Sequence, residues 1–165
     1  MRTAIQNLAK RREDEEGFTL IELMVVVLII AILMAIAIPT FLSARNTAND
    51  RAAQSDLRNA LTAEKSIYAN DGQSYISDTV SLNSAEANLS WTTGFAASAK
   101  TNQVAVSLST TGKTVCLTSQ SASGSYFEIV DNGSSTMYGS LGSTAPTACS
   151  GTPMPSGSGW SSTAW

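Results

Sequence analysis

Glu22 is the ionisable side chain whose position most needs a chemical explanation. It stands at the front edge of an uninterrupted apolar run, residues 23–38. An ionised side chain within a membrane-spanning helix costs about 2.5 to 3.5 kcal/mol on insertion scales and usually has a partner. Arg12 lies ten positions before Glu22, and the next basic residue after it is Arg45. We therefore expect the counter-charge of Glu22 to come from another chain.

Catalytic chemistry is limited by what the sequence lacks. The chain has no histidine, which removes the commonest general base and the Ser/His/Asp and Cys/His arrangements. It also has no GxxxxGK[ST] loop and no GxGxxG fingerprint, the motifs that cradle phosphates and dinucleotides. EF-hand spacing is absent from the acids of its second half. We therefore expect no catalytic residue, no metal site and no cofactor, and the chain is not predicted to be an enzyme.

The charge balance gives no sign of a nucleic-acid coating protein. The formal net charge is −3 at pH 7, whereas a phosphate backbone favours dense patches of Lys and Arg. A local contact with DNA stays open, but nothing in the sequence indicates one.

The element that carries Glu22 is predicted to be a membrane-spanning helix. With Phe18 and the apolar residues that follow it, the run reaches the length of about 20 residues that crosses a bilayer core. The basic residues 10–12 precede it, and by the positive-inside rule they hold the N-terminus in the cytoplasm. A secretory signal cut after Ala37 and an uncleaved anchor are the alternatives. The run is long for a signal peptide, whose apolar region has roughly 7 to 15 residues.

Cleavage of the bond between Gly17 and Phe18 would supply the missing charge, because it creates an α-amino group four residues before Glu22. A neighbouring copy, displaced along a filament axis, could then bring that cation to the carboxylate. Residues 17–27 (Gly-Phe-Thr-Leu-Ile-Glu-Leu-Met-Val-Val-Val) resemble the type III signal sequence of type IV prepilins and their relatives. The resemblance implies that a membrane peptidase cuts after Gly17 and methylates Phe18, and that Glu22 guides assembly.

The resemblance also implies the partners and the location. A pilin polymerises with itself into a helical filament, after processing by the prepilin peptidase, with an inner-membrane platform protein and a cytoplasmic assembly ATPase acting indirectly. It starts in the cytoplasmic membrane and ends at the cell surface, where the filament supports adhesion, twitching motility or DNA uptake. A pseudopilin of a type II secretion system is the nearest alternative. A membrane-anchored binding domain that never polymerises is the alternative from another class.

A second, amphipathic helical segment is predicted after the apolar run. Pro39 lacks an amide proton, so we expect a kink there, with termination of the helix as the alternative. Apolar residues then recur at intervals of three, four and seven, namely Ala53, Leu57, Ala60, Leu61, Ile67 and Tyr68. Gly72 is the expected helix stop. Two charged rows are interpreted as solvated surface or lateral contacts between subunits: Arg51, Arg58 and Lys65, and Asp50, Glu64 and Asp71.

The rest of the chain is predicted to be β-rich. Residues 103–109 and 114–118 read as a hairpin, residues 126–130 as a third strand and residues 136–138 as the start of a fourth. Residues 73–99 are expected to be an irregular connection. Cys116 and Cys149 both lie in the exported part, where a disulfide is expected if the compartment is oxidising. In a pilin, such a bridge would pin the variable C-terminal region to the sheet.

These elements predict an α+β protein, a pilin fold in which one long N-terminal helix packs on a small antiparallel sheet. The predicted parts are a leader (residues 1–17), a membrane or filament-core segment (18–42), an amphipathic segment (43–71), a β-rich head (72–149) and a flexible tail (150–165). For Trp160 and Trp165 in the tail, docking on the head and exposure both stay open.

Overall fold

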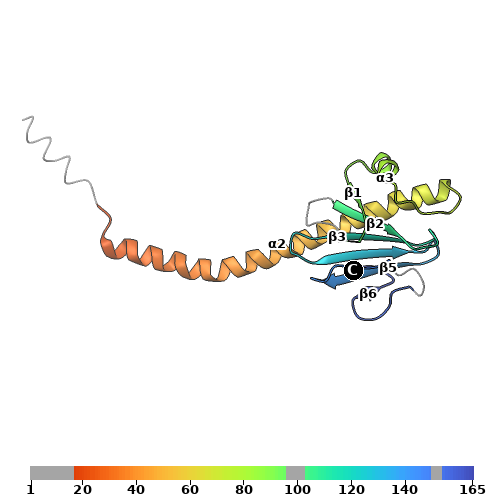
Figure 1. The fold of residues 1–165 in the computed structure, drawn as a ribbon. Helices are drawn as coiled ribbons and strands as arrows, with labels where there is room; N and C mark the ends of the chain where they lie inside the picture. Colours follow the sequence, from red (N-terminus) through yellow and green to blue (C-terminus); the bar gives the residue numbers. More distant parts are fainter. Residues whose placement is uncertain (1–16, 96–102, 150–153) are drawn as a thin grey trace, which may run out of the picture. The chain divides into compact units, whose positions relative to one another are not determined.

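The computed structural model describes residues 17–95, 103–149 and 154–165, so most of the predicted leader lies outside the described residues. The chain divides into two units, residues 1–43 and residues 44–165. The first described element, α2 (Leu20–Asn70), contributes to both units (Figure 1). The sheet belongs wholly to the second unit. The predicted α+β class, with a long N-terminal helix and a mostly antiparallel sheet, is confirmed.

Both ends of α2 have local causes. At the N-terminus the Thr19 hydroxyl accepts a hydrogen bond of 3.2 Å from the Glu22 amide, which makes Thr19 an N-cap of the preferred type. At the C-terminus Gly72 has a φ of +69°, and the amide of Gln73 donates to the carbonyl of Tyr68 at 3.1 Å. A left-handed glycine just after the last turn is the usual helix stop, as the sequence predicted.

The sheet of the second unit has six strands in sequential order, β1-β2-β3-β4-β5-β6. Neighbouring strands are antiparallel from β2 to β6, whereas β1 and β2 are parallel. The strands are β1 (Ser90–Thr93), β2 (Gln103–Leu108), β3 (Val115–Gln120), β4 (Tyr126–Asp131), β5 (Thr136–Gly142) and β6 (Trp160–Ser161). All four strands predicted from alternation are present, and the predicted meander forms the body of the sheet.

The connection from α2 to the sheet is more regular than predicted. It contains β1 and a short helix, α3 (Thr79–Ala85). The carboxylate of Asp78 caps α3 by accepting hydrogen bonds from the amides of Val80 and Ser81, at 3.4 and 3.0 Å. The expectation of an irregular connection over residues 73–99 was therefore wrong for this part of it, because a seven-residue helix and a four-residue strand are too short to show a hydrophobic period.

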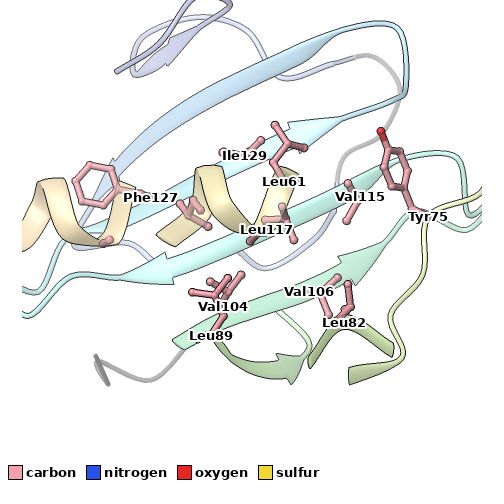
Figure 2. Packing of buried hydrophobic residues seen from close by; sticks show 13 residues of the cluster. Leu61, Tyr75, Leu82, Leu89, Val104, Val106, Val115, Leu117, Phe127 and Ile129 are labelled. Carbon is pink, nitrogen blue, oxygen red and sulfur yellow. The ribbon is translucent and has the colours of Figure 1, made fainter. Parts of the chain in front are cut away.

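The hydrophobic core lies between the second part of α2 and one face of the sheet (Figure 2). The predicted stripe of α2 supplies Leu57 and Leu61, and Ile67 and Tyr68 pack at its margin. Each fully buried Leu, Val or Phe contributes about 1.5 to 3 kcal/mol relative to an exposed one. The remaining apolar side chains of the core are Ala53, Ala60, Tyr75, Leu82, Leu89, Val104, Val106, Val115, Leu117, Phe127 and Ile129.

The C-terminal region is tied to the sheet at two places. A disulfide joins Cys116 on β3 to Cys149, as predicted. Beyond the undescribed residues 150–153, Trp160 pairs with Gly139 of β5, and the Trp165 indole donates to the Gly139 carbonyl at 3.0 Å. The tail was expected to be flexible, but its described part is docked on the sheet. Its two tryptophans provide large apolar surfaces for docking, although the rest of the tail is rich in Gly, Ser and Pro.

Candidate membrane and assembly segment

The first part of α2 presents a continuous surface of exposed apolar side chains. Every residue of 18–42 is exposed, and Phe18 at its start is 82% exposed. Large exposed apolar patches on proteins mark surfaces that meet a membrane or another protein. The helix is long and apolar enough to cross a bilayer, since it contains a stretch of 18 residues with a mean hydropathy of 3.2. A signal sequence near an N-terminus passes the same test, so the finding supports membrane contact and leaves topology to other observations.

Glu22 lies in the first turn of α2 with an exposed side chain. A carboxylate in the first turn interacts favourably with the helix dipole, by about 0.3 to 1 kcal/mol at an exposed site. Among the described residues no Lys or Arg forms an ion pair with Glu22, and the ion pair that the structure contains, Lys65 with Asp131, is in the other unit. The helix therefore positions the carboxylate, and the described residues supply no counter-charge for it.

The bond between Gly17 and Phe18 precedes the helix. Neither residue is in a helix or strand, and both are exposed. Among the described residues other than Gly17 and its chain neighbours, no heavy atom lies within 4 Å of the place where Gly17 would carry a Cβ. A scissile bond needs an accessible backbone, and this one has it. The structure brings Gly17, Phe18 and Glu22 to the same end of α2, while Pro39 lies well inside that helix.

Pro39 does not end the helix. α2 continues through it to Asn70, so the alternative of simple termination is wrong. Because proline has no amide hydrogen, the Ala35 carbonyl loses its usual donor. The hydroxyl of Thr40 donates to the neighbouring Ile36 carbonyl at 3.0 Å. The kink at Pro39 stays a prediction.

The charged rows on the second part of α2 are solvated surface only in part, since Arg51, Arg58, Lys65 and Asp71 are exposed whereas Asp50 is half-buried and Glu64 is buried. Lys65 forms an ion pair of 2.8 Å with Asp131 of β4, and Asp50 accepts a hydrogen bond from the hydroxyl of Ser123. Glu64 is fully buried. Arg58 also lies over the Trp165 ring, at 5.2 Å from its centroid. Lys65, Asp50 and Arg58 therefore make contacts within the head that are distant in sequence, and no helical pattern reports such contacts.

Asp131 is the centre of a buried polar cluster. Besides Lys65, its carboxylate accepts hydrogen bonds from the hydroxyls of Tyr75 and Thr136 and from the amide of Gly133. Burial alone would raise the pKa of Asp131, but these donors together hold it below its ordinary value. Burial and the hydrogen bond to Asp131 raise the pKa of Tyr75. The carboxylate of Asp131 has hydrogen-bond donors and a cation as partners, so we interpret the cluster as structural.

Glu64 and Glu128 are also buried carboxylates, but their pKa values are raised and that of Asp131 is lowered. Burial raises the pKa of each to about 7. For Glu64 the nearby Ile76 amide offsets part of that effect, although neither carboxylate oxygen has a partner with hydrogen-bond geometry among the described residues. Sequence reasoning placed Glu64 on a polar row and missed its burial. The helical period contained the signal, since Glu64 lies four residues after the buried Ala60. In the described part of the chain, no group of three or more His, Cys, Asp or Glu gathers in metal-binding geometry.

One protein-family model matches the segment that contains the start of α2. The model of the prokaryotic N-terminal methylation motif matches residues 14–38, which include Gly17, Phe18 and Glu22. Residues 14–38 are therefore similar to the N-terminal segment that this motif describes. The chain is also similar in part to type IV pilins and to a type II secretion protein.

Three curated relatives are similar to part of this chain. The major component PilA4 of the type IV wide pilus of Thermus thermophilus is 44% identical over 69 residues, 42% of this chain and 52% of that protein. The type IV major pilin PilA of Myxococcus xanthus is 49% identical over 53 residues, 32% of this chain and 24% of that protein. The type II secretion system core protein G of Pseudomonas aeruginosa is 38% identical over 65 residues, 39% of this chain and 45% of that protein.

The matches thus cover about half or less of each relative's length. No solved structure matches the chain.

Proposed function

We propose that this chain is the structural subunit of a type IV pilus-like filament and polymerises through its apolar helix after leader cleavage. One observation carries the proposal: residues 18–42 are an exposed apolar surface that holds a single carboxylate, Glu22. Two of the relatives are named as major pilus components. The role is structural, and filament-borne adhesion, twitching motility or DNA uptake are the activities it would support.

Maturation is the first step. A prepilin peptidase cuts the accessible bond between Gly17 and Phe18, removes residues 1–17 and methylates the new N-terminus on Phe18. The match of the methylation motif to residues 14–38 supports this step. The methylated amine keeps its positive charge at neutral pH, since an α-amino group has an ordinary pKa of about 7.7 to 8.0.

Assembly is the second step. The amine of Phe18 on one copy pairs with Glu22 of a neighbour that is displaced along the filament axis. In the apolar surroundings of a helix bundle an unpaired charge is expensive, so the pair selects the register in which it forms. Apolar contacts along residues 20–42 supply the bulk of the association.

Location and other partners follow from the same proposal. Before assembly the chain spans the cytoplasmic membrane once, with residues 10–12 on the cytoplasmic side. An inner-membrane platform protein and a cytoplasmic ATPase drive extraction into the filament, which ends at the cell surface. The disulfide between Cys116 and Cys149 fits a head that is folded in an oxidising compartment.

A pseudopilin of a type II secretion system is the second candidate, because one relative is the core protein G of such a system. Overexpression and gene deletion together separate the two. Long extracellular fibres on overexpression favour a pilus subunit, whereas absent surface fibres and blocked protein export on deletion favour a pseudopilin. A membrane-anchored binding domain, the third reading, would tolerate replacement of Glu22 by alanine.

The processing step is tested by co-expressing the chain with a prepilin peptidase and weighing the product. We expect loss of residues 1–17 and gain of one methyl group on Phe18. Replacement of Gly17 by a bulky residue is the control and should leave the precursor intact. An uncut wild-type chain, or a cut after Ala37, would contradict the proposal.

A further inference from the structure

Glu128 occupies an unusual place for a carboxylate, the middle of a central strand. On β4 the side chains of Phe127 and Ile129 enter the core under α2, and side chains alternate between faces along a strand. Glu128 therefore points to the other face of the sheet. Its side chain is nevertheless only 4% exposed, so the far face is covered at this point.

The chain that follows β5 provides the cover. Leu141 and residues 144–148 line a hollow of about 400 Å³ together with Glu128. The disulfide from Cys149 to Cys116 holds the end of this segment against the sheet. Cys116 pairs with Val130, two residues from Glu128 on the same face, so the bridge is anchored beside the carboxylate. The hollow is part of a covalently closed region.

The carboxylate has no partner of its own. Within residues 17–95, 103–149 and 154–165 no group donates a hydrogen bond to Glu128, and no cation forms an ion pair with it. Its paired neighbours are Thr118 on β3 and Gly139 on β5, and residues 144–148 carry no ionisable side chain. Burial raises the pKa of Glu128 to about 7. Unlike the oxygens of Glu64, those of Glu128 are not among the enclosed unpartnered atoms of the described residues, so its carboxylate opens into the hollow that it lines.

The surroundings of Glu128 suit a cation that carries apolar groups. A Cβ on Gly139 would come within 2.8 Å of the Trp160 ring, and paired residues share a face, so this indole lies on the same side of the sheet as Glu128. Leu141, Ala145 and Pro146 add apolar lining. Carboxylates and aromatic rings both attract ammonium groups, and a hollow of this size fits a small molecule.

We propose that this hollow is a binding site for a small alkylammonium ligand. The ammonium group lies at Glu128, where it donates charge-assisted hydrogen bonds to the carboxylate, and the alkyl chain lies against Leu141 and Pro146. The hydroxyls of Thr144 and Thr147, which also line the hollow, accept the remaining ammonium protons. This site does not depend on polymerisation, so it stands or falls separately from the proposed filament function.

The test uses the full chain in detergent micelles at pH 8, above the range in which Glu128 takes up its proton. n-Butylammonium and its neutral analogue n-butanol are titrated, and binding is followed by saturation-transfer NMR of each ligand. We expect saturable binding of n-butylammonium and at least about tenfold weaker binding of n-butanol, because a hydrogen bond to a charged group contributes about 1.5 to 3 kcal/mol. Equal binding of both ligands, or no binding of n-butylammonium, would overturn the proposal.

Three variants locate the site. Glu128→Gln keeps the shape of the side chain and removes its charge, so n-butylammonium should bind about tenfold more weakly or worse. Glu64→Gln makes the same change at the other buried acid and should leave the affinity unchanged. Ala145→Leu narrows the hollow while Glu128 stays, and it should also weaken binding. Wild-type affinity in both Glu128→Gln and Ala145→Leu would show that the ligand binds elsewhere and would refute the site.

Discussion

The two parts of α2 have the same secondary structure and opposite environments. Residues 20–43 bury no side chain, whereas the part within residues 44–70 buries six. The second part is stabilised by its own sheet, and the apolar side chains of the first part are exposed. An α-helix supplies its own backbone hydrogen bonds, but an apolar surface must be covered by something else. The first part is therefore the region where lipid or other copies have to act.

The acids of the two parts show the same contrast. Glu22 is exposed on an apolar helix without a cation, and Glu64 is buried in the head without a donor. Burying the charged form of Glu64 costs free energy, and the head lowers this cost by keeping the carboxyl group protonated up to about pH 7. For Glu22 in the first part, we propose that a neighbouring copy supplies the counter-charge. Changes in the first part should thus affect assembly, and changes in the second should affect folding.

The largest expected effect is the loss of assembly on Glu22→Ala. Filaments should disappear from sheared surface fractions, because the N-terminal amine then lacks its partner, while the thermal midpoint of the detergent-solubilised chain stays unchanged. Electron microscopy and circular dichroism measure the two effects. Val26→Ala, another truncation on the same exposed segment, is the control and should still give filaments.

Removal of the disulfide tests the head. In the chain-entropy model, opening the bridge of sequence separation 33 costs about 4 kcal/mol. Cys116→Ala combined with Cys149→Ala should lower the free energy of unfolding by roughly that amount in urea, with membrane insertion unchanged. An unaltered unfolding midpoint would show that the bridge contributes nothing to the head.

A matched pair of substitutions compares the two parts directly. Leu57→Ala removes a fully buried side chain and should destabilise the head by roughly 3 kcal/mol. Leu33→Ala makes the same change in the exposed part, where Leu33 is 60% exposed, and should shift the unfolding midpoint of the dispersed chain hardly at all. Similar shifts for both variants would contradict the division between the parts.

The smallest expected effect is a pH dependence from Glu64. Its pKa of about 7 lies above the ordinary 4.5, so its contribution to stability is full below pH 4.5 and is lost as the pH rises to about 7. The shift corresponds to a loss on the order of 2 to 3 kcal/mol. Glu64→Gln should flatten this part of the pH profile of urea unfolding. Glu128 titrates in the same range, so the slope should shrink without vanishing.

Much of the fold could be predicted because its signals are local. The apolar run, the stripe through Leu57 and Leu61, and the alternation in β2 each report one element at a time. Gly17, Phe18 and Glu22 could be selected as candidates for cleavage and assembly because they lie within six residues of sequence, and the methylation-motif model covers all three. The chemistry proposed for them still rests on experiments.

What could not be predicted depends on contacts distant in sequence. Glu64 was placed on a polar row because of its charge, yet it is buried where α2 packs on the head. The parallel pairing of β1 with β2 gives no local signal. The docking of Trp165 was left open, because its partners Phe127 and Tyr138 come from two different strands. In each case the local sequence pattern fits more than one structure, and tertiary packing decides which one forms.

Helical reconstruction of purified filaments by cryo-electron microscopy tests the central claim most directly. The account predicts that the methylated amine of Phe18 in one copy lies within about 4 Å, the distance of an ion pair, of the Glu22 carboxylate in a neighbouring copy. A reconstruction in which Glu22 faces solvent, or pairs with a basic residue of a head domain, would contradict it.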